Sequence, residues 1–163
     1  MKTRDKQLYM DIASRVALMS YANRLKVGAV LVKNRNIISF GYNGTPMGWD
    51  NTCEDKHYFN PEIEDLHEDE IESLYPFSDE HGRFLLMTKP IVIHAEENAI
   101  IKAAKDGRSV SGASLFITHA PCINCAKLVL NAGIIEVFYD STYRSLEGIK
   151  FLMDGGVYVE QVL

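Results

Sequence analysis

The chain has 163 residues, a length typical of one globular domain. Hydrophobic residues make up 47% of it and charged residues 24%, the balance of a soluble protein with a core rather than of a disordered one. No apolar run approaches the roughly 18 residues of a membrane span, and residues 1–6 are not followed by the apolar stretch of a secretion signal. We therefore expect one domain over residues 1–163, neither membrane-bound nor secreted.

The formal net charge of −5 is unevenly distributed along the chain. Between Glu54 and Glu80 there are eleven acidic residues and one lysine, a local net charge of −10, which leaves +5 on the rest. A protein that binds long nucleic acid needs a dominant basic face. The charge therefore argues against a polynucleotide partner, whereas a small anionic ligand needs only a few cationic groups at one site.

The N-terminal third of the chain predicts a helix followed by a hairpin. Apolar residues at helical spacing predict a helix over Leu8–Ser20. Two short apolar runs, Val27–Val32 and Ile37–Phe40, flank a turn at Asn34–Asn36 and predict two antiparallel strands. The segment Gly41–Gly48, with three glycines and one proline, is expected to be a loop.

The acidic part of the chain, at about residues 50–90, interrupts this pattern. It contains three prolines, and we expect an insertion packed on the body of the domain, with one short helix over Asp65–Leu74. From residue 91 on, helices alternate with strands: Ala95–Lys105 (helix), Ser114–Thr118 (strand), Ile123–Ala132 (helix), Ile135–Tyr139 (strand), Ser145–Met153 (helix) and Val157–Val162 (strand). This alternation predicts an α/β fold with a partly parallel sheet.

Two short motifs carry the residues suited to chemistry. His94 and Glu96 open one predicted helix, and Cys122 and Cys125 open another. A helix N-terminus favours thiolates, and cysteines three residues apart lie on the same side of the helix, so both can bind one ion. With one nitrogen of His94 they make three ligands, the zinc pattern that leaves a fourth position for water. Zinc lowers the pKa of such a water, and Glu96 lies close enough to act as general acid and base.

Taken singly, each half of this pattern has an ordinary explanation. A lone Cys-x-x-Cys is also typical of a redox pair or of buried thiols, and a lone histidine is often a hydrogen-bonded core residue. The joint pattern, His-x-Glu followed after twenty-four residues by Pro-Cys-x-x-Cys, resembles the signature of zinc deaminases. The three cysteines are too few for a disulfide scaffold and fit the reducing cytosol.

Four segments together resemble the deoxycytidylate (dCMP) deaminases: Val27–Ala29, Gly41–Gly48, His94–Ile100 and Pro121–Lys127. The likeness extends from the first helix to the last strand, and the short chain with its long insertion looks like a viral or bacterial member. It implies a three-layer α/β/α fold of the cytidine-deaminase type, built around a mixed five-stranded sheet. It also implies a cytoplasmic enzyme, in a bacterium or in an infected host cell.

The activity that the resemblance implies is the zinc-dependent hydrolysis of dCMP to dUMP and ammonia, which supplies dUMP for dTTP synthesis. Such enzymes are typically homohexamers, activated by dCTP and inhibited by dTTP, with Mg²⁺ on the triphosphate. In this chemistry Glu96 takes a proton from water and delivers protons to N3 and the departing amine. Asn43 hydrogen-bonds the sugar or base, and the backbone N–H of Ala95 meets the pyrimidine carbonyl.

The resemblance further implies nucleotide-binding residues outside the zinc motif. The allosteric triphosphate is expected at Gly41, Tyr42, Asn43, Gly44, Asn98 and Lys105. As structural alternatives, the glycines permit positive φ and Lys105 is an ordinary cation at a helix C-terminus. The substrate also requires a phosphate clamp, because deamination by itself does not distinguish dCMP from deoxycytidine. Its candidates, each of which a solvated surface explains equally well, are Arg24, Lys26, Tyr143 and Arg144.

Some members of this family hold a second, structural zinc ion with ligands from the first helix and the insertion. Here the first-helix region contains Ser20–Ala22 and lacks the cysteine that such members carry. Cys53 remains, with three histidines as possible companions: His57, His67 and His81. One cysteine with scattered histidines is a weak signal for zinc, and a packed or surface set of side chains is the alternative.

Other functions remain open at this point. A tRNA adenosine deaminase shares the zinc motif and a similar asparagine loop, but needs a basic RNA surface. Cytidine deaminase and the deaminase of riboflavin synthesis are less like the Gly-Tyr-Asn-Gly loop. Outside enzymes, a zinc-stabilised binding module would have four protein ligands and no open position.

Overall fold

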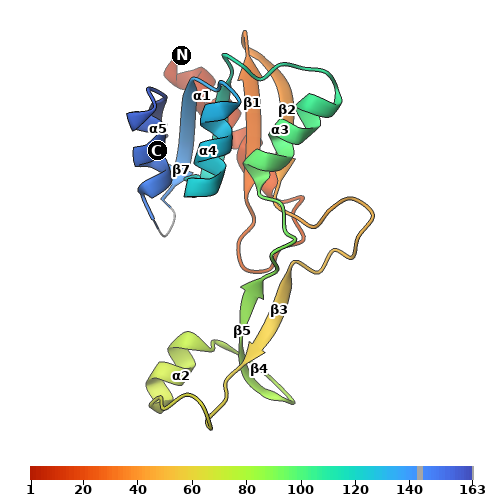
Figure 1. Cartoon of the computed structure of the whole chain (residues 1–163), viewed down its shortest axis with the longest axis vertical. Helices are drawn as coiled ribbons and strands as arrows, with labels where there is room; N and C mark the ends of the chain where they lie inside the picture. Colours follow the sequence, from red (N-terminus) through yellow and green to blue (C-terminus); the bar gives the residue numbers. More distant parts are fainter. Residues whose placement is uncertain (143–144, 163) are drawn as a thin grey trace.

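The computed structural model describes residues 1–142 and 145–162 (Figure 1). Tyr143 and Arg144, two of the candidate phosphate ligands, lie outside the described residues. The helices and strands have the following bounds: α1 Thr3–Ala17, β1 Gly28–Lys33, β2 Asn36–Tyr42, β3 Glu54–Tyr58, α2 Glu68–Leu74, β4 Phe77–Asp79, β5 Gly82–Thr88, α3 Ala95–Lys105, β6 Ser114–His119, α4 Ile123–Asn131, β7 Glu136–Ser141, α5 Glu147–Asp154 and β8 Tyr158–Gln161.

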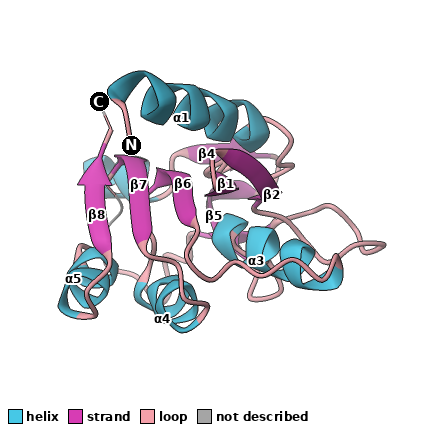
Figure 2. Cartoon of the chain, turned by 90° about the horizontal axis from the view of Figure 1, so that it is seen from above, coloured by secondary structure: helices cyan, strands magenta, loops and turns pink. Residues whose placement is uncertain are grey.

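The main sheet has the strand order β2-β1-β6-β7-β8. β1 is antiparallel to both of its neighbours, and β6, β7 and β8 are parallel, so the sheet is mixed as expected. Figure 2 shows α1 over one face of the sheet, and α3, α4 and α5 along the other. The central strands are buried on both faces, which is why they are near-continuous apolar runs. The predicted three-layer α/β/α arrangement is confirmed.

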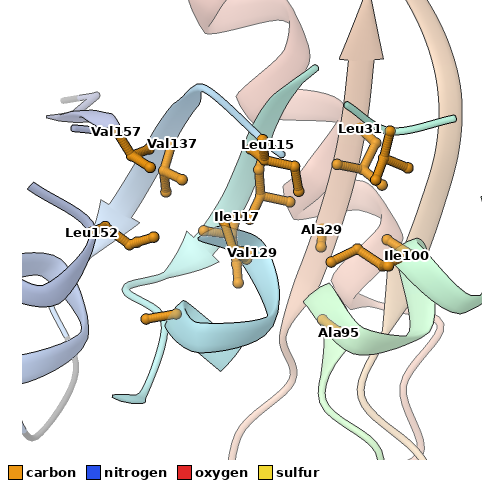
Figure 3. Packing of buried hydrophobic residues seen from close by; sticks show 14 of the residues in the cluster. Ala29, Leu31, Ala95, Ile100, Leu115, Ile117, Val129, Val137, Leu152 and Val157 are labelled. Atoms are coloured by element: carbon orange, nitrogen blue, oxygen red, sulfur yellow. The ribbon is translucent and has the colours of Figure 1, made fainter. Parts of the chain in front are cut away.

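The core has two parts, one on each face of the sheet, because successive side chains of a strand point to opposite faces. Ala29 and Leu31 of β1 belong to the cluster under α3, α4 and α5, whereas Val30 and Val32 belong to the cluster under α1. Successive strand residues point to opposite faces, so one apolar run serves both layers. The larger cluster continues through β6 and β7 to the helices that cover them (Figure 3).

The described residues form the five helices that the sequence predicts, at approximately the predicted positions. The bounds expected for α3 are confirmed residue by residue. The first helix begins earlier than Leu8–Ser20, because its first turn is polar and carries no periodic signal, and it ends earlier, at Ala17. In the described ranges, no helix combines the length and the apolar character required to cross a membrane.

The acidic insertion forms a projecting arm, residues 54–88, in which β3, β5 and β4 make a three-stranded antiparallel sheet with α2 beside it (Figure 1). Within the part of the chain that the structure describes, no helix or strand of the arm packs on one of the body. The expectation that the insertion packs on the body is therefore wrong. The arm has its own aromatic contacts, in which Phe84 packs against Phe77 and Tyr58.

Gly41 lets α3 lie directly on β2. A Cβ at this position would stand 2.3 Å from the carbonyl oxygen of Ala95 and 2.5 Å from the backbone nitrogen of Ala99. Gly41 also pairs with Ala29 inside the hairpin, so the loop expected to start at Gly41 starts after Tyr42. This close contact fixes the first turn of α3, where His94 and Glu96 lie.

Candidate active site

Two helix N-termini bring the three candidate metal ligands together. His94 is the N-cap residue of α3, Cys122 is the N-cap residue of α4, and Cys125 lies in the first turn of α4. His94 Nδ1 lies 3.3 Å from the Sγ of Cys125 and 3.7 Å from that of Cys122. Tetrahedral zinc, with Zn–N near 2.0–2.1 Å and Zn–S near 2.3 Å, places nitrogen and sulfur about 3.6 Å apart. The spacing and the donor set therefore fit zinc, with one position left for water.

The protonation of these groups also suits a metal. Hydrogen bonds from Cys125 and His94 lower the pKa of Cys122 to about 3, so Cys122 is a thiolate at neutral pH. The hydrogen bond to Cys122, together with burial, raises the pKa of Cys125. The two thiols thus share one proton, and a metal that binds both of them displaces it.

Glu96 is the second residue of α3 and only 3% exposed. Burial raises the pKa of its carboxyl group, because a charged carboxylate loses hydration there. A carboxyl group with a raised pKa, beside three metal ligands, is suited to accept and release a proton during a reaction.

His94, Cys122 and Glu96 line one cavity of about 230 Å³. Its wall contains five residues named by the sequence analysis, His94, Glu96, Cys122, Asn43 and Arg24. It also contains seven that the sequence analysis did not select: Leu25, Val27, Glu54, Thr88, Val92, His119 and Ala120. Ala95, also named, is the first residue of α3, where a backbone N–H has no partner within the helix.

Asn43 holds the loop between α1 and β1. Its Oδ1 accepts a hydrogen bond from the N–H of Val27 at 2.8 Å, and its Nδ2 donates to the carbonyl of Leu25 at 2.8 Å. The carbonyl oxygen and the amide NH₂ each have bonding capacity left. Asn43 therefore shapes the cavity wall and still presents an amide to it.

The candidate phosphate ligands divide into three cases. Arg24 lines the cavity, and its Nη1 donates to the Oγ1 of Thr88 at 3.2 Å. Lys26 is exposed and is not among the lining residues. Tyr143 and Arg144 lie outside the described residues.

The Gly-Tyr-Asn-Gly segment is tied to α3 by hydrogen bonds. Asn98 donates its Nδ2 to the carbonyl of Tyr42 at 2.8 Å. The backbones of Gly44 and Ile93 exchange two hydrogen bonds, directly before His94. Gly41 and Gly44 are not among the glycines with positive φ, so that explanation for them is wrong. Lys105 is an exposed cation in the last turn of α3.

A second zinc site is not formed by the described residues. The one group of three or more metal-binding side chains among them is His94, Cys122 and Cys125. Cys53 is 1% exposed and packs with Ala22 and Val92, and so contributes to a small apolar cluster instead. The hypothesis of a structural zinc at Cys53 with His57, His67 or His81 is therefore wrong for this part of the chain, and the packed alternative holds.

Three polar residues of the cavity were missed by the sequence analysis. His119 ends β6, and burial lowers the pKa of its ring, so the ring is neutral near pH 7. Its place at the carboxyl end of a parallel strand, two residues before Pro121, is a signal that could have identified it. Glu54 and Thr88 lie outside every motif, and they face each other at the cavity only because β3 pairs with β5.

Comparison with known proteins agrees with this geometry. A family model described as the cytidine and deoxycytidylate deaminase zinc-binding region matches residues 3–141. The chain is 36% identical over 151 residues to the deoxycytidylate deaminase of Enterobacteria phage T4, covering 82% of this chain and 76% of that protein. It is 34% identical over 157 residues to ComE operon protein 2 of Bacillus subtilis, covering 96% and 70%.

A solved structure matches the whole chain. The crystal structure of a dCMP deaminase from the cyanophage S-TIM5, in complex with dCMP and dUMP, superimposes with a TM-score of 0.77 at 37% identity. The match covers 99% of this chain and 98% of the cyanophage chain, so the body and the arm are both included.

Proposed function

Since the chain belongs to the cytidine and deoxycytidylate deaminase family, we propose that it hydrolyses dCMP to dUMP and ammonia and so supplies dUMP for dTTP synthesis. The observation that supports this most is the grouping of His94, Cys122 and Cys125 as one set of metal ligands, at a cavity whose wall also contains buried Glu96. When bound, zinc would polarise a water molecule at its open position and make it nucleophilic at neutral pH.

The residues of this chain supply the proton transfers. In the reaction an oxygen from water bonds to C4 of cytosine and the bond from C4 to the amino nitrogen breaks. Glu96 accepts the two protons of the water one after the other, and delivers the first to N3 and the second to the amino nitrogen, which departs as ammonia. Asn43 faces the sugar or base, and the N–H of Ala95 donates to the pyrimidine carbonyl. The cavity of about 230 Å³ takes the base and sugar, and Arg24 meets the phosphate.

The test compares substrates by their ultraviolet absorbance change. The zinc-loaded enzyme is offered dCMP, dCTP, deoxycytidine and a tRNA anticodon stem-loop side by side. Turnover of dCMP is expected, with less or none of the stem-loop. Turnover of the stem-loop without dCMP would refute the proposal in favour of a tRNA deaminase, and a fully bound zinc without any turnover would favour a binding module.

Regulation by dCTP and dTTP, each with Mg²⁺, is part of the same proposal, with the effector at Gly41–Gly44, Asn98 and Lys105. The proposal is supported by hydrogen bonds that connect this segment to α3 through Asn98 and to Ile93, the residue before His94. An effector on the segment would thus act one residue away from a metal ligand. We expect the two triphosphates to shift the dCMP saturation curve in opposite directions. An unchanged curve would contradict this.

We also propose a homohexamer in the cytoplasm, where reduced thiols persist. The exposed apolar side chains of the arm, among them Ile63 at 81% and Met87 at 50% exposure, are consistent with subunit contacts. Light scattering of the purified enzyme should give about six times the 18.4 kDa of one chain. A mass of 18.4 kDa at all concentrations would refute it.

A further inference from the structure

Arg24 is held from two sides by one pair of facing residues at the base of the arm. Glu54 is the first residue of β3 and Thr88 is the last residue of β5, and the two lie opposite each other in the antiparallel pairing. The Oε1 of Glu54 accepts hydrogen bonds from the N–H of Asn23 at 3.0 Å and of Arg24 at 3.1 Å. The Oγ1 of Thr88 accepts one from the guanidinium at 3.2 Å.

The carboxylate of Glu54 is occupied by these bonds. The residue is 6% exposed, and its other oxygen accepts a hydrogen bond from Asn23 Nδ2 at 3.4 Å. A buried carboxylate is costly unless hydrogen-bonded, and two consecutive backbone N–H groups are a good partner for it. Its charge is thus partly compensated by the N–H groups of the loop. Asn43 binds the rest of that loop, at Leu25 and Val27.

Arg24 is the one permanent cation on the cavity wall, within the ranges that the structure describes. A guanidinium has five donors in a planar fork that matches a phosphate. Thr88 takes only one of them, so the others stay available. A side chain held in place before binding loses less rotamer freedom when it binds.

We propose that Glu54 and Thr88 are positioning residues that hold Arg24 as the ligand of the substrate's 5′-phosphate and thereby set the preference for a nucleotide over a nucleoside. The inference rests on the proposed function, since it assumes that dCMP occupies the cavity. In this proposal the base of the acidic arm contributes to the preference for a nucleotide, because Glu54 fixes the backbone of Arg24 and Thr88 fixes its guanidinium.

The test measures the ratio of kcat/KM for dCMP to kcat/KM for deoxycytidine with the zinc-loaded enzyme. R24A removes the charged contact to phosphate, and the ratio should fall about 10- to 100-fold. E54A should lower the ratio in the same direction, because KM should rise more for dCMP than for deoxycytidine. E54Q keeps an acceptor oxygen for the two N–H groups and should retain most of the ratio.

Thr88 and Asp55 complete the set of variants. T88V removes the acceptor of the guanidinium and should lower the ratio by less than E54A. T88S keeps the hydroxyl and should have nearly the wild-type ratio. D55A is the matched control, because Asp55 is the next acidic residue of β3 and pairs with Lys89 at 3.5 Å instead. In the double variant R24A/E54A the second change should have no further effect on the ratio, since both act on one contact.

Three outcomes would overturn the inference. One is a loss of kcat/KM by the same factor for both substrates in E54A and T88V, which indicates a general effect on folding. Another is a double variant R24A/E54A in which the effects of the two single changes on the ratio add in full. The third is a wild-type enzyme that does not deaminate dCMP, which refutes the proposed function as well and so differs from the first two. For a variant too slow to assay, calorimetry gives the dissociation constants of dUMP and deoxyuridine. Their ratio measures the preference for the phosphate without turnover.

Discussion

Glu96 is one of two buried carboxylates in the described residues, and it lies within the cavity beside the three candidate ligands. Replacing it with glutamine preserves its size and removes its ability to accept a proton. We expect kcat for dCMP to fall by at least about 100-fold, the usual lower value for loss of a general acid–base group. Zinc content, measured by mass spectrometry of the metal, should stay near one per chain.

The control for this prediction is Cys125→Ser, which changes a ligand instead. Because three ligands hold the ion, loss of one thiolate should reduce zinc content and activity together. A Glu96→Gln enzyme that retains full turnover would remove Glu96 from the mechanism. One that loses zinc as well would make Glu96 a structural support of the site.

At the scale of elements, the contact between α3 and β2 depends on Gly41. In Gly41→Ala the added Cβ would meet the backbone of Ala95 and Ala99 at 2.3 and 2.5 Å, and backbone atoms cannot rotate away. We expect the free energy of unfolding in urea to fall by about 1–3 kcal/mol, the usual effect of overpacking. Gly44→Ala is the control, because its nearest neighbouring atom is 4.0 Å away. Equal urea midpoints for the two variants would contradict the prediction.

The sheet of the arm contains a carboxylate whose pKa is strongly lowered. Asp79 accepts hydrogen bonds from Lys56 at 2.6 Å and from Tyr58 at 2.9 Å, and the bond from Lys56 is the main reason that its pKa falls from 3.8 to about 2. A carboxyl group with a lower pKa in the folded state stabilises that state above its ordinary pKa, and the effect is lost as the pH falls toward 2. The protection factors of the amides of β3–β5, which are corrected for the intrinsic pH dependence of exchange, should therefore fall between pH 4 and pH 2.

Asp79→Asn separates this effect from general acid unfolding. Its arm amides should already exchange faster at pH 5, and the change specific to the window below pH 4 should disappear. Amide exchange is the appropriate measurement, because the arm does not pack on the helices and strands of the body among the described residues and loss of zinc at low pH acts on the body. Unchanged protection of the Asp79→Asn arm at pH 5 would contradict the prediction.

The sequence predicts local elements better than it predicts what brings distant segments together. Helix α3 could be delimited because the apolar spacing and the cation-rich last turn agree. The arm strands were missed because β3 has three consecutive charged residues followed by His57 and Tyr58, and so lacks the alternation of apolar and polar residues that marks a strand. The zinc ligands and Glu96 could be found because all four residues lie in two short motifs. Glu54 could not, because its partners are about thirty residues away and meet it only in the fold.

At the scale of the molecule, the arm and the body can be separated by design. Tyr58 and Phe84 pair across β3 and β5, so an Asn-Gly turn replacing residues 59–83 would close the two strands as a hairpin. The pair formed by Glu54 and Thr88 at the arm base stays. We expect the shortened chain to bind zinc, to melt within a few degrees of the wild type and to deaminate dCMP. A body that fails to fold would show that the arm stabilises it.

The shortened chain also tests what the acidity of the arm does. Residues 59–83 contain nine acidic residues and one arginine, so their removal changes the net charge from −5 to +3. Without the acidic arm, the basic body should attract polynucleotides through their phosphates, and this attraction weakens with salt. A single-stranded DNA of about twenty nucleotides should inhibit the shortened enzyme at low salt, less at high salt, and leave the wild type unaffected. Equal inhibition of both would show that the acidity of the arm does not keep long nucleic acids away from a site built for one nucleotide.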